Sequence, residues 1–493
     1  NNQPANVNNK LWKDYFNPIT GGPMEYNRVT EPVIAELKSI VGSQNVLDDP
    51  EQMLSYSHDE ATGAKWRHLP EVVVKPQNTQ QISAILKLAN QERIPVTPRG
   101  AGSGLAAGAV PFLGGILLTL EKMNRIIELD RDNMFMVVEP GVTTAEVQQC
   151  AREAGLFYAG DPCSADSSFI GGNVATNAGG NKAIRYGVTG QHVFGLEVVL
   201  ADGQVAVLGG KTIKEVSGYN LIQLMIGSEG TLGVITKIYL KLQPRPQFNG
   251  VIMAPFASIP AAIQLVPEMI TKSGIIPTSI EFMDNLCIKA AEQFLNKQLM
   301  FNHAAAYIII ELDGNSEGQL LAEMEMLAEQ CYRNNALDVL VGDNAATQER
   351  IWKPRRVLAE ALRVISPVYS MEDIVVPIKE IPAVVLAINS LSEKYGIRIA
   401  NFGHAGDGNI HATLLKDQLG HQEWDERKDQ LLDELYAEVY RRGGKISGEH
   451  GIGAKRKEAL TQYIDPVALQ TMKTIKRALD PNGILNPGKI FNL

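Results

Sequence analysis

Two short glycine-rich segments carry the residues best suited to bind a metal ion. Residues 401–411 read Asn-Phe-Gly-His-Ala-Gly-Asp-Gly-Asn-Ile-His, and residues 447–453 read Ser-Gly-Glu-His-Gly-Ile-Gly. The chain has 8 histidines in 493 residues, yet His404 and His411 bracket the first segment and Glu449 and His450 stand side by side in the second. Two histidines and a carboxylate are a common ligand set for a divalent metal and leave positions open for water or substrate. A lone histidine is more often a hydrogen-bonded core residue, but this grouping predicts a site.

Three further glycine-rich segments predict an extended ligand that lies against the backbone. Residues 97–104 read Thr-Pro-Arg-Gly-Ala-Gly-Ser-Gly, residues 171–180 read Gly-Gly-Asn-Val-Ala-Thr-Asn-Ala-Gly-Gly, and residues 227–235 read Gly-Ser-Glu-Gly-Thr-Leu-Gly-Val-Ile. Glycine permits positive φ and close approach, so successive N–H groups can hold a pyrophosphate. Leu105 breaks the G-x-G-x-x-G spacing of a nicotinamide-binding fold. Each segment alone is also compatible with a plain turn or a β-bulge.

The elements that must position these segments alternate along the chain. Strand-like Glu71–Lys75 precedes a helical pattern over Thr79–Arg93, in which Ile82, Ile85, Leu86 and Ala89 recur at helical spacing, and Ile94–Thr97 is the next strand. Residues 243–246 (Gln-Pro-Arg-Pro) indicate a linker. Beyond it, four predicted strands (251–256, 278–283, 306–312 and 337–341) with two helices resemble a ferredoxin-like layer. Polar residues return after 350, which suggests that the C-terminal part completes a shared site.

Composition narrows the class of protein. A chain of 493 residues predicts two or three domains. The net charge of −9 argues against nucleic acid, which needs a concentrated basic surface. Four scattered cysteines, Cys150, Cys163, Cys287 and Cys331, exclude a cysteine-ligated iron–sulfur cluster within the chain and fit a reducing cytoplasm. We see neither a secretory leader nor an apolar run long enough to span a bilayer, and expect a cytoplasmic protein.

Taken together, these motifs resemble the FAD-binding domain of the vanillyl-alcohol oxidase (PCMH-type) superfamily, and more narrowly the group of D-lactate dehydrogenases, glycolate oxidase subunits D and D-2-hydroxyglutarate dehydrogenases. The resemblance covers residues 40–491 and includes Leu485-Asn-Pro-Gly488 near the end. It implies an α+β fold with a two-subdomain FAD-binding domain, a ferredoxin-like cap and a C-terminal helical segment that returns to the flavin. The implied division is an N-terminal extension over 1–30, the FAD-binding domain over 31–245, a cap with the metal site over 246–450, and the C-terminal segment over 451–493.

The resemblance also assigns the cofactor residues. Residues 97–104 would hold the FAD pyrophosphate, and the first loop contains neither His nor Cys, so we expect non-covalent FAD. The residues expected to contact FAD are Pro98, Arg99, Gly100, Ala101, Gly102, Ser103, Gly104, Asp161, Pro162, Gly171, Gly172, Asn173, Ala175, Thr176, Asn177, Gly179, Gly180, Tyr186, Gly187, Glu229, Gly230, Gly233, Ile235 and Asn486.

In the same family the two histidine motifs supply metal ligands and a catalytic base. Carried over by position, His404, His411 and Glu449 bind the metal and His450 is the base; Zn, Fe and Mn all accept this ligand set. Oxidation of a 2-hydroxy acid removes the hydroxyl proton while a hydride leaves Cα for flavin N5, and a metal lowers the hydroxyl pKa. Arg355, three residues after Trp352, is the expected anchor of the substrate carboxylate. Arg356 is expected to face solvent.

The substrate and the electron acceptor stay open. D-2-hydroxyglutarate dehydrogenases place a Lys in a strand that corresponds to Tyr369–Asp373, which here holds acids and no cation, and this favours D-lactate or glycolate. Without cluster cysteines, the acceptor must be another molecule, such as an electron-transferring flavoprotein, including that of an electron-bifurcating lactate dehydrogenase complex, or an iron–sulfur subunit. The Asn-rich extension, with Trp12, Tyr15 and Phe16, either docks such a partner or is a tail. Two other functions remain alternatives to an FAD-dependent dehydrogenase: an NAD-dependent metal dehydrogenase and a non-catalytic flavin relay subunit. The oligomeric state also stays open, and a homo-oligomer is one option.

Overall fold

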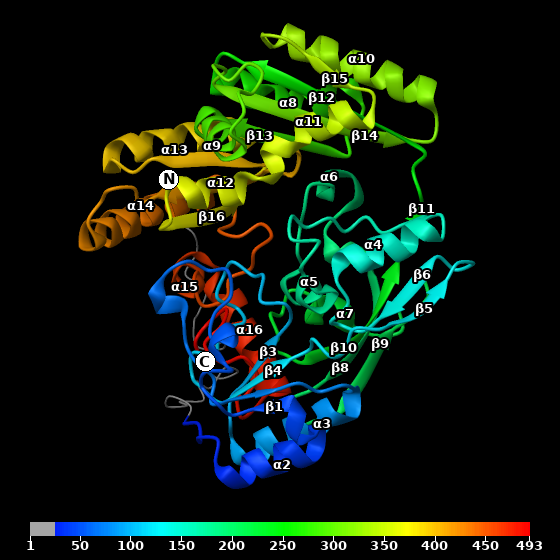
Figure 1. Ribbon diagram of the computed structural model, residues 1–493, viewed down its shortest axis with the longest axis vertical. Helices are drawn as coiled ribbons and strands as arrows, with labels where there is room; N and C mark the ends of the chain where they lie inside the picture. Colours follow the sequence, from blue (N-terminus) through cyan, green and yellow to red (C-terminus); the bar gives the residue numbers. More distant parts are fainter. Residues whose placement is uncertain (1–24) are drawn as a thin grey trace, which may run out of the picture.

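The structure, a computed structural model, describes residues 25–493. In Figure 1 the lower part combines residues up to about 245 with the C-terminal segment, and the upper part holds the elements from β12 to α14. The portion of the predicted N-terminal extension that contains Trp12, Tyr15 and Phe16 lies outside the described residues.

A four-stranded sheet holds the first glycine loop at its edge. Its order is β1 (Val46–Leu47), β2 (Val72–Val74), β4 (Ile116–Thr119) and β3 (Val96–Arg99), with β2, β4 and β3 parallel. Strands β2 and β4 are fully buried, as parallel strands covered on both faces must be. Helices α2 (Glu31–Val41) and α3 (Thr79–Glu92) belong to this core. Helix α3 buries the predicted stripe, Ile82, Ile85, Leu86 and Ala89, and its N-cap Asn78 accepts a hydrogen bond from the N–H of Gln81.

A five-stranded antiparallel sheet completes the first part. Its order is β5 (Ile126–Asp130), β6 (Phe135–Val138), β10 (Val234–Lys241), β8 (Val193–Val199) and β9 (Val205–Gly209). Helices α4 (Thr144–Glu153), α5 (Ile170–Thr176) and α7 (Leu221–Met225) belong to the core of this sheet, whereas Ile184 of α6 (Ala183–Tyr186) packs against the core of the cap. The predicted linker is partly a strand, because β11 (Gln243–Pro244) pairs with β7 (Leu156–Phe157).

The cap is larger than the four strands expected between 250 and 342. Its antiparallel sheet runs β15 (Leu340–Gly342), β12 (Phe248–Phe256), β14 (Ala306–Gly314), β13 (Ser279–Asp284), β17 (Ile399–His404), β18 (Asn409–Leu415) and β16 (Tyr369–Val375). The last three strands come from the region after 350, and β17 joins the others by pairing with β13. The polar region after 350 thus adds three strands to the cap sheet, in addition to the four strands expected between 250 and 342.

Helices cover both faces of the cap sheet because its strands alternate apolar side chains between two cores. One core receives α8 (Ile259–Ser273), α10 (Glu317–Arg333), α13 (Ile381–Tyr395) and α14 (His421–Arg441). The other receives α9 (Asn285–Leu295), α11 (Ala345–Arg356) and α12 (Leu358–Ile365). Along β12, Ile252 and Ala254 enter the first core, whereas Val251 and Met253 enter the second.

The C-terminal segment returns to the first sheet. After α15 (Lys457–Tyr463) and α16 (Pro466–Leu479), Leu485 forms a parallel bridge with Val96 of β3. The N–H of Val96 donates to the carbonyl of Ile484, and the N–H of Asn486 donates to the carbonyl of Val96, both at 2.7 Å. This contact brings the Asn-Pro-Gly motif beside the strand that leads into the first glycine loop.

Single 3-10 turns link these elements at Ser43–Asn45, Leu54–Tyr56, Ala64–Trp66, Thr189–Gln191, Ile378–Glu380 and Ala405–Asp407. Within residues 25–493, every helix is too short or too polar to cross a membrane.

Candidate active site

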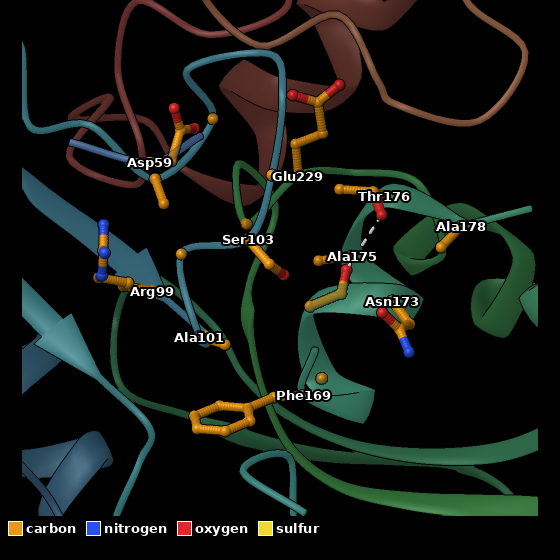
Figure 2. A pocket seen from close by; sticks show the side chains of 18 of the residues that line it. Asp59, Arg99, Ala101, Ser103, Phe169, Asn173, Ala175, Thr176, Ala178 and Glu229 are labelled. Atoms are coloured by element: carbon orange, nitrogen blue, oxygen red, sulfur yellow. Dashed lines mark hydrogen bonds between the residues drawn. The ribbon is translucent and has the colours of Figure 1, made fainter. Parts of the chain in front are cut away.

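The glycine loops line an open cavity whose empty space, the part at its mouth included, is about 1340 Å³. Figure 2 shows the loop after β3, with Ala101 and Ser103, facing α5 with Asn173, Ala175 and Thr176. The expected FAD residues that line this cavity are Pro98, Arg99, Gly100, Ala101, Gly102, Ser103, Gly104, Pro162, Gly171, Gly172, Asn173, Ala175, Thr176, Gly179, Glu229, Gly230, Gly233 and Ile235. Three segments far apart in sequence thus line one common space, as a ligand that contacts all three requires.

Gly102 shows why the first loop needs glycine. Its φ is +77°, and a Cβ there would lie 2.0 Å from Nη2 of Arg99. The Arg99 side chain is buried below the loop, where Nη1 donates to the carbonyl of His58 at 2.7 Å. The loop therefore curls over a fixed guanidinium, a path that a residue with a side chain follows only under strain.

Replacing Gly102 with Ala is expected to weaken FAD binding roughly ten- to hundredfold. A left-handed backbone costs a non-glycine residue about 1–3 kcal/mol, about 1.4 kcal/mol is tenfold in affinity, and Arg99 must also move. Fluorescence titration of the apoprotein with FAD measures the change. Gly155→Ala is the matched control, because Gly155 has a φ of +76°, has no atom within 4 Å of the added Cβ and lies outside the cavity lining. Equal affinities of the two variants would contradict this role of Gly102.

Six of the expected FAD residues do not line this cavity: Asp161, Asn177, Gly180, Tyr186, Gly187 and Asn486. The Tyr186 hydroxyl donates to Asp313 of the cap at 2.8 Å. Asn486 is buried and its Nδ2 donates to the carbonyl of Glu229 at 2.7 Å. These two side chains connect loops to one another in this structure.

Two buried charged residues beside the cavity were missed by sequence reasoning. Asp59 lines the cavity, and burial raises the pKa of its carboxyl to about 6. Lys489 follows the Asn-Pro-Gly motif, and burial lowers the pKa of its amine to about 7. Its Nζ donates to the carbonyl of Val110 at 2.7 Å. The position of Lys489 next to that motif was the signal available in the sequence.

Glu229 connects the cavity to the second histidine motif. Its carboxylate accepts hydrogen bonds from the N–H groups of Ile452 and Gly453, both at 2.7 Å. In Figure 2 it lies across the cavity from Phe169. Burial raises the pKa of this carboxyl. The turn that carries Glu449 and His450 is thereby fixed against the cavity, and both residues line it.

The two histidine motifs meet at one point. The Nε2 atoms of His404 and His411 each lie 3.3 Å from Oε1 of Glu449, and Nε2 of His450 lies 3.5 Å from the same oxygen. His404 ends β17 and His411 lies on β18, across a turn through Gly408, whose φ is +89°. A Cβ on Gly408 would lie 2.0 Å from the carbonyl oxygen of Val376, so the turn needs glycine.

This cluster fits a divalent metal. Three imidazole nitrogens and a carboxylate oxygen converge, and Nε2 of His404 is buried with no hydrogen-bond partner among residues 25–493. Although burial opposes it, the carboxylates of Glu281 and Glu449 raise the pKa of His404 well above its usual value. Burial alone would raise the pKa of Glu449, but the charge of His404 and its hydrogen bond hold that pKa well below its usual value. A set built on Asp373, His411, Glu449 and His450 also has donor atoms within 4.8 Å of one another. We favour the set that includes His404, because Asp373 is already saturated with hydrogen bonds.

Arg355 reaches the cluster through Glu281, a residue that sequence reasoning missed. The Nε and Nη2 atoms of Arg355 lie 2.8 and 2.7 Å from Oε2 of Glu281. The other Glu281 oxygen lies 2.6 Å from Nδ1 of His404. All three side chains are buried, and the guanidinium lies 4.9 Å from the ring centroid of Phe402. The signal in the sequence was an acid between two apolar residues, Ile280 and Phe282, of a predicted strand. Arg356 is exposed and pairs with Glu349, as expected.

The two acids in the strand that lacks a lysine are not free. Glu372 is buried, with Nζ of Lys455 at 2.9 Å, Nε of Arg456 at 3.5 Å and the Tyr436 hydroxyl at 2.6 Å. Burial works against it, but these cations lower the pKa of Glu372 to about 2. Asp373 is also bound by the protein, through Ser447 and Asn409, so both acids of this strand already have partners. The absence of a lysine in Tyr369–Asp373 stands.

Both halves of the chain match known protein families. Residues 245–490 match the family described as FAD linked oxidases, C-terminal domain, and residues 70–209 match the FAD binding domain. Glycolate oxidase subunit GlcD of Bacillus subtilis is 38% identical over 463 residues, covering 94% of this chain and 97% of that protein. D-lactate dehydrogenase of Anaerostipes hadrus is 38% identical over 472 residues, covering 94% and 98%. D-2-hydroxyglutarate dehydrogenase of Stutzerimonas stutzeri is 33% identical over 482 residues, covering 94% and 100%.

Solved structures share the fold over more than nine-tenths of the chain. A substrate complex of p-cresol methylhydroxylase aligns with a TM-score of 0.78 at 19% identity, covering 95% of this chain and 99% of that one. The 4-ethylphenol oxidase from Gulosibacter chungangensis aligns with a TM-score of 0.74 at 20% identity, covering 93% and 97%. At this identity the likeness concerns the fold alone.

Proposed function

The chain belongs to the family of FAD-linked oxidases, and from this premise we propose that it oxidises D-lactate to the corresponding 2-oxo acid. It is an FAD-dependent oxidoreductase that acts on hydroxy acids. The family resemblance and the α+β fold class predicted from the sequence are confirmed by these relatives and by the structural neighbours.

One observation supports the proposed chemistry most directly. Glu449 and His450 belong to the histidine–carboxylate cluster and also line the cavity of the glycine loops. A small hydroxy acid held at the cluster would thus lie against the cofactor. The three glycine segments would hold FAD, which when bound accepts the hydride that leaves the substrate Cα. Cys163 also lines the cavity, but the first loop has neither His nor Cys, and we keep non-covalent FAD as part of the proposal.

The side chains divide the remaining work. His404, His411 and Glu449 would hold a Zn, Fe or Mn ion, which when bound polarises the substrate hydroxyl. Nε2 of His450 accepts the hydroxyl proton. Glu281 fixes the guanidinium of Arg355, whose Nη1 makes no hydrogen bond within residues 25–493 and is left for the substrate carboxylate.

The preference for D-lactate rests on two supports. Tyr369–Asp373 offers no cation for a second carboxylate, and a relative with 38% identity is named a D-lactate dehydrogenase. Glycolate is the second candidate, because the Bacillus subtilis relative with the same identity is named a glycolate oxidase subunit. The domain boundaries at 31–245, 246–450 and 451–493 are part of the same proposal, supported by the separate sheets and by the return of Leu485 to β3.

We also propose that the electrons leave to a partner protein. The four cysteines of the chain lack the spacing of an iron–sulfur motif, so the acceptor must be supplied from outside. An electron-transferring flavoprotein or an iron–sulfur subunit meets that need.

Anaerobic bleaching of the bound flavin tests the substrate. D-lactate is expected to bleach it faster than glycolate, L-lactate, D-2-hydroxyglutarate and D-malate at equal concentration. Faster bleaching by either dicarboxylate would overturn the choice of D-lactate. No bleaching by any of the five would favour a relay subunit. Adding purified electron-transferring flavoprotein to the reduced protein and following its absorbance then tests the acceptor.

A further inference from the structure

We propose that Asp373 is the positioning residue of the active site, holding Glu449 and His450 in place and orienting the His411 and His450 rings. The inference rests on the proposed cluster of His404, His411 and Glu449. It assigns to Asp373 no contact with substrate, metal or FAD. Its effect passes through the backbone that it holds by hydrogen bonds and through its charge beside the two imidazoles.

The first support is a set of hydrogen bonds on a fully buried carboxylate. Oδ2 of Asp373 accepts from the Ser447 hydroxyl at 2.7 Å and from the N–H groups of Gly448, Glu449 and His450 at 3.0, 3.0 and 2.8 Å. The N–H of Gly448 also donates to the backbone carbonyl of Asp373 at 3.0 Å, whereas the part-buried N–H groups of Glu449 and His450 have the Asp373 carboxylate as their hydrogen-bond acceptor within residues 25–493. One oxygen thus fixes the backbone of both reactive residues.

The second support is the place of Asp373 in the sheet. It lies on β16, an end strand, directly opposite His411 of β18. On its free edge, Ser447 forms a bridge with Asp373 and Lys445 forms a bridge with Val375. The turn at 447–450 is therefore attached to the sheet that carries His404 and His411. The Asp373 side chain binds the turn directly after this bridge, through the N–H groups of residues 448–450.

The third support is the orientation of two imidazoles. Nδ1 of His411 lies 3.8 Å from Oδ1 of Asp373, and Nδ1 of His450 lies 3.8 Å from Oδ2. Their opposite edges face Glu449, and the two rings are stacked, with centroids 5.1 Å apart at 5°. Neither Nδ1 atom makes a hydrogen bond within residues 25–493, so Asp373 acts on these rings through its charge. A carboxylate on the Nδ1 side favours the proton there, which leaves the lone pair of Nε2 directed at the cluster centre.

The hydrogen bonds that Asp373 accepts also argue against a role for it as a metal ligand. Oδ2 accepts four hydrogen bonds, and Oδ1 accepts one from Nδ2 of Asn409 at 2.8 Å. A carboxylate has about four lone-pair sites, so little capacity remains for an ion. By contrast, Oε1 of Glu449 faces three imidazole nitrogens.

The experiment compares Asp373→Asn with the wild-type holoenzyme. One of the two carboxylate oxygens becomes an NH₂ group, which cannot accept a hydrogen bond. The variant therefore loses either the four hydrogen bonds from residues 447–450 or the one from Asn409. Hydrogen–deuterium exchange of the peptide that covers residues 447–453 is expected to become at least tenfold faster while FAD stays bound. Affinity for Zn²⁺, measured by competition with a chelator and without substrate, is expected to fall about ten- to hundredfold. Asp313→Asn is the matched control, since Asp313 is a buried cap carboxylate that binds Tyr186 and not the turn.

Each outcome decides between the parts of the proposal. Unchanged exchange at 447–453 in Asp373→Asn overturns the positioning role, whatever the metal does. If the wild-type protein binds no Zn²⁺, Mn²⁺ or Fe²⁺, the proposed ligand set fails, and the exchange result still decides the role of Asp373. Ser447→Ala removes one of the four hydrogen bonds and serves if Asp373→Asn does not fold. It is expected to speed exchange at 447–453 by a smaller factor, and an unchanged rate again overturns the role.

Discussion

Replacing His450 with Asn is expected to slow anaerobic reduction of the flavin by D-lactate about 10²- to 10⁴-fold while FAD stays bound, which is the usual contribution of a general base. Asn keeps a polar side chain of similar size in the cavity lining but has no nitrogen that accepts a proton. The measurement is stopped-flow bleaching of the flavin absorbance, with the FAD content of each preparation determined beside it.

Two controls give this result its meaning. His192 is a buried histidine of the FAD-binding half. Its ring contacts Tyr158 edge-on, and it lies outside the cavity lining. His192→Asn should therefore leave the rate per bound flavin unchanged. Metal content separates the two roles that the geometry allows His450, since its Nε2 lies almost as close to Glu449 as those of the other two histidines. Retained metal with slow reduction supports the base. Lost metal would make His450 a ligand, and an unchanged rate would remove it from the mechanism.

The parts of the site that were predictable from sequence are those encoded locally. Gly102 and Gly408 occupy backbone conformations that other residues avoid. Closely spaced glycines therefore predict these loops from the sequence alone. His404 and His411 stand seven residues apart across one such turn, and a short turn leaves few ways to arrange them. The helix at Thr79–Glu92 was predictable for the same reason, because its apolar period needs no distant partner.

The parts that were missed depend on residues distant in sequence. Glu281 lies opposite His404 only because β13 pairs with β17 across more than a hundred residues of chain. The sequence showed Glu372 and Asp373 only as adjacent acids in a strand without a cation, and adjacent residues of a strand point to opposite faces. One therefore meets the turn at 447–450 and the other meets Lys455 and Tyr436. An acid inside an apolar strand signals a buried partner, but the sequence does not say which one.

The three added strands of the cap had the same cause. Residues 369–415 contain strand-like runs, but only their pairing with β13 makes them one sheet with residues 248–314. That pairing changes how the metal site is understood. His404 and His411 lie on neighbouring strands of a rigid sheet, and the loop with Glu449 and His450 is attached to its edge. The ligands therefore come from one body, while Glu229 fixes that body to the FAD cavity.

His404→Ala is expected to reduce affinity for Zn²⁺ by more than about a hundredfold, because loss of an outer partner alone costs about ten- to hundredfold and His404 is a proposed ligand. The deletion removes the imidazole whose Nε2 lies 3.3 Å from Glu449, and Glu281 keeps Arg355 as its buried partner, so the pair is not left as an isolated charge. Elemental analysis of the purified variant, with FAD content as the folding control, measures the effect. His421→Ala is the comparison, since His421 begins α14 on the exposed side of the cap and lies outside the cluster. Metal content equal to wild type in His404→Ala would refute the ligand assignment. Loss of both metal and FAD would instead show that the cluster holds the two halves of the molecule together.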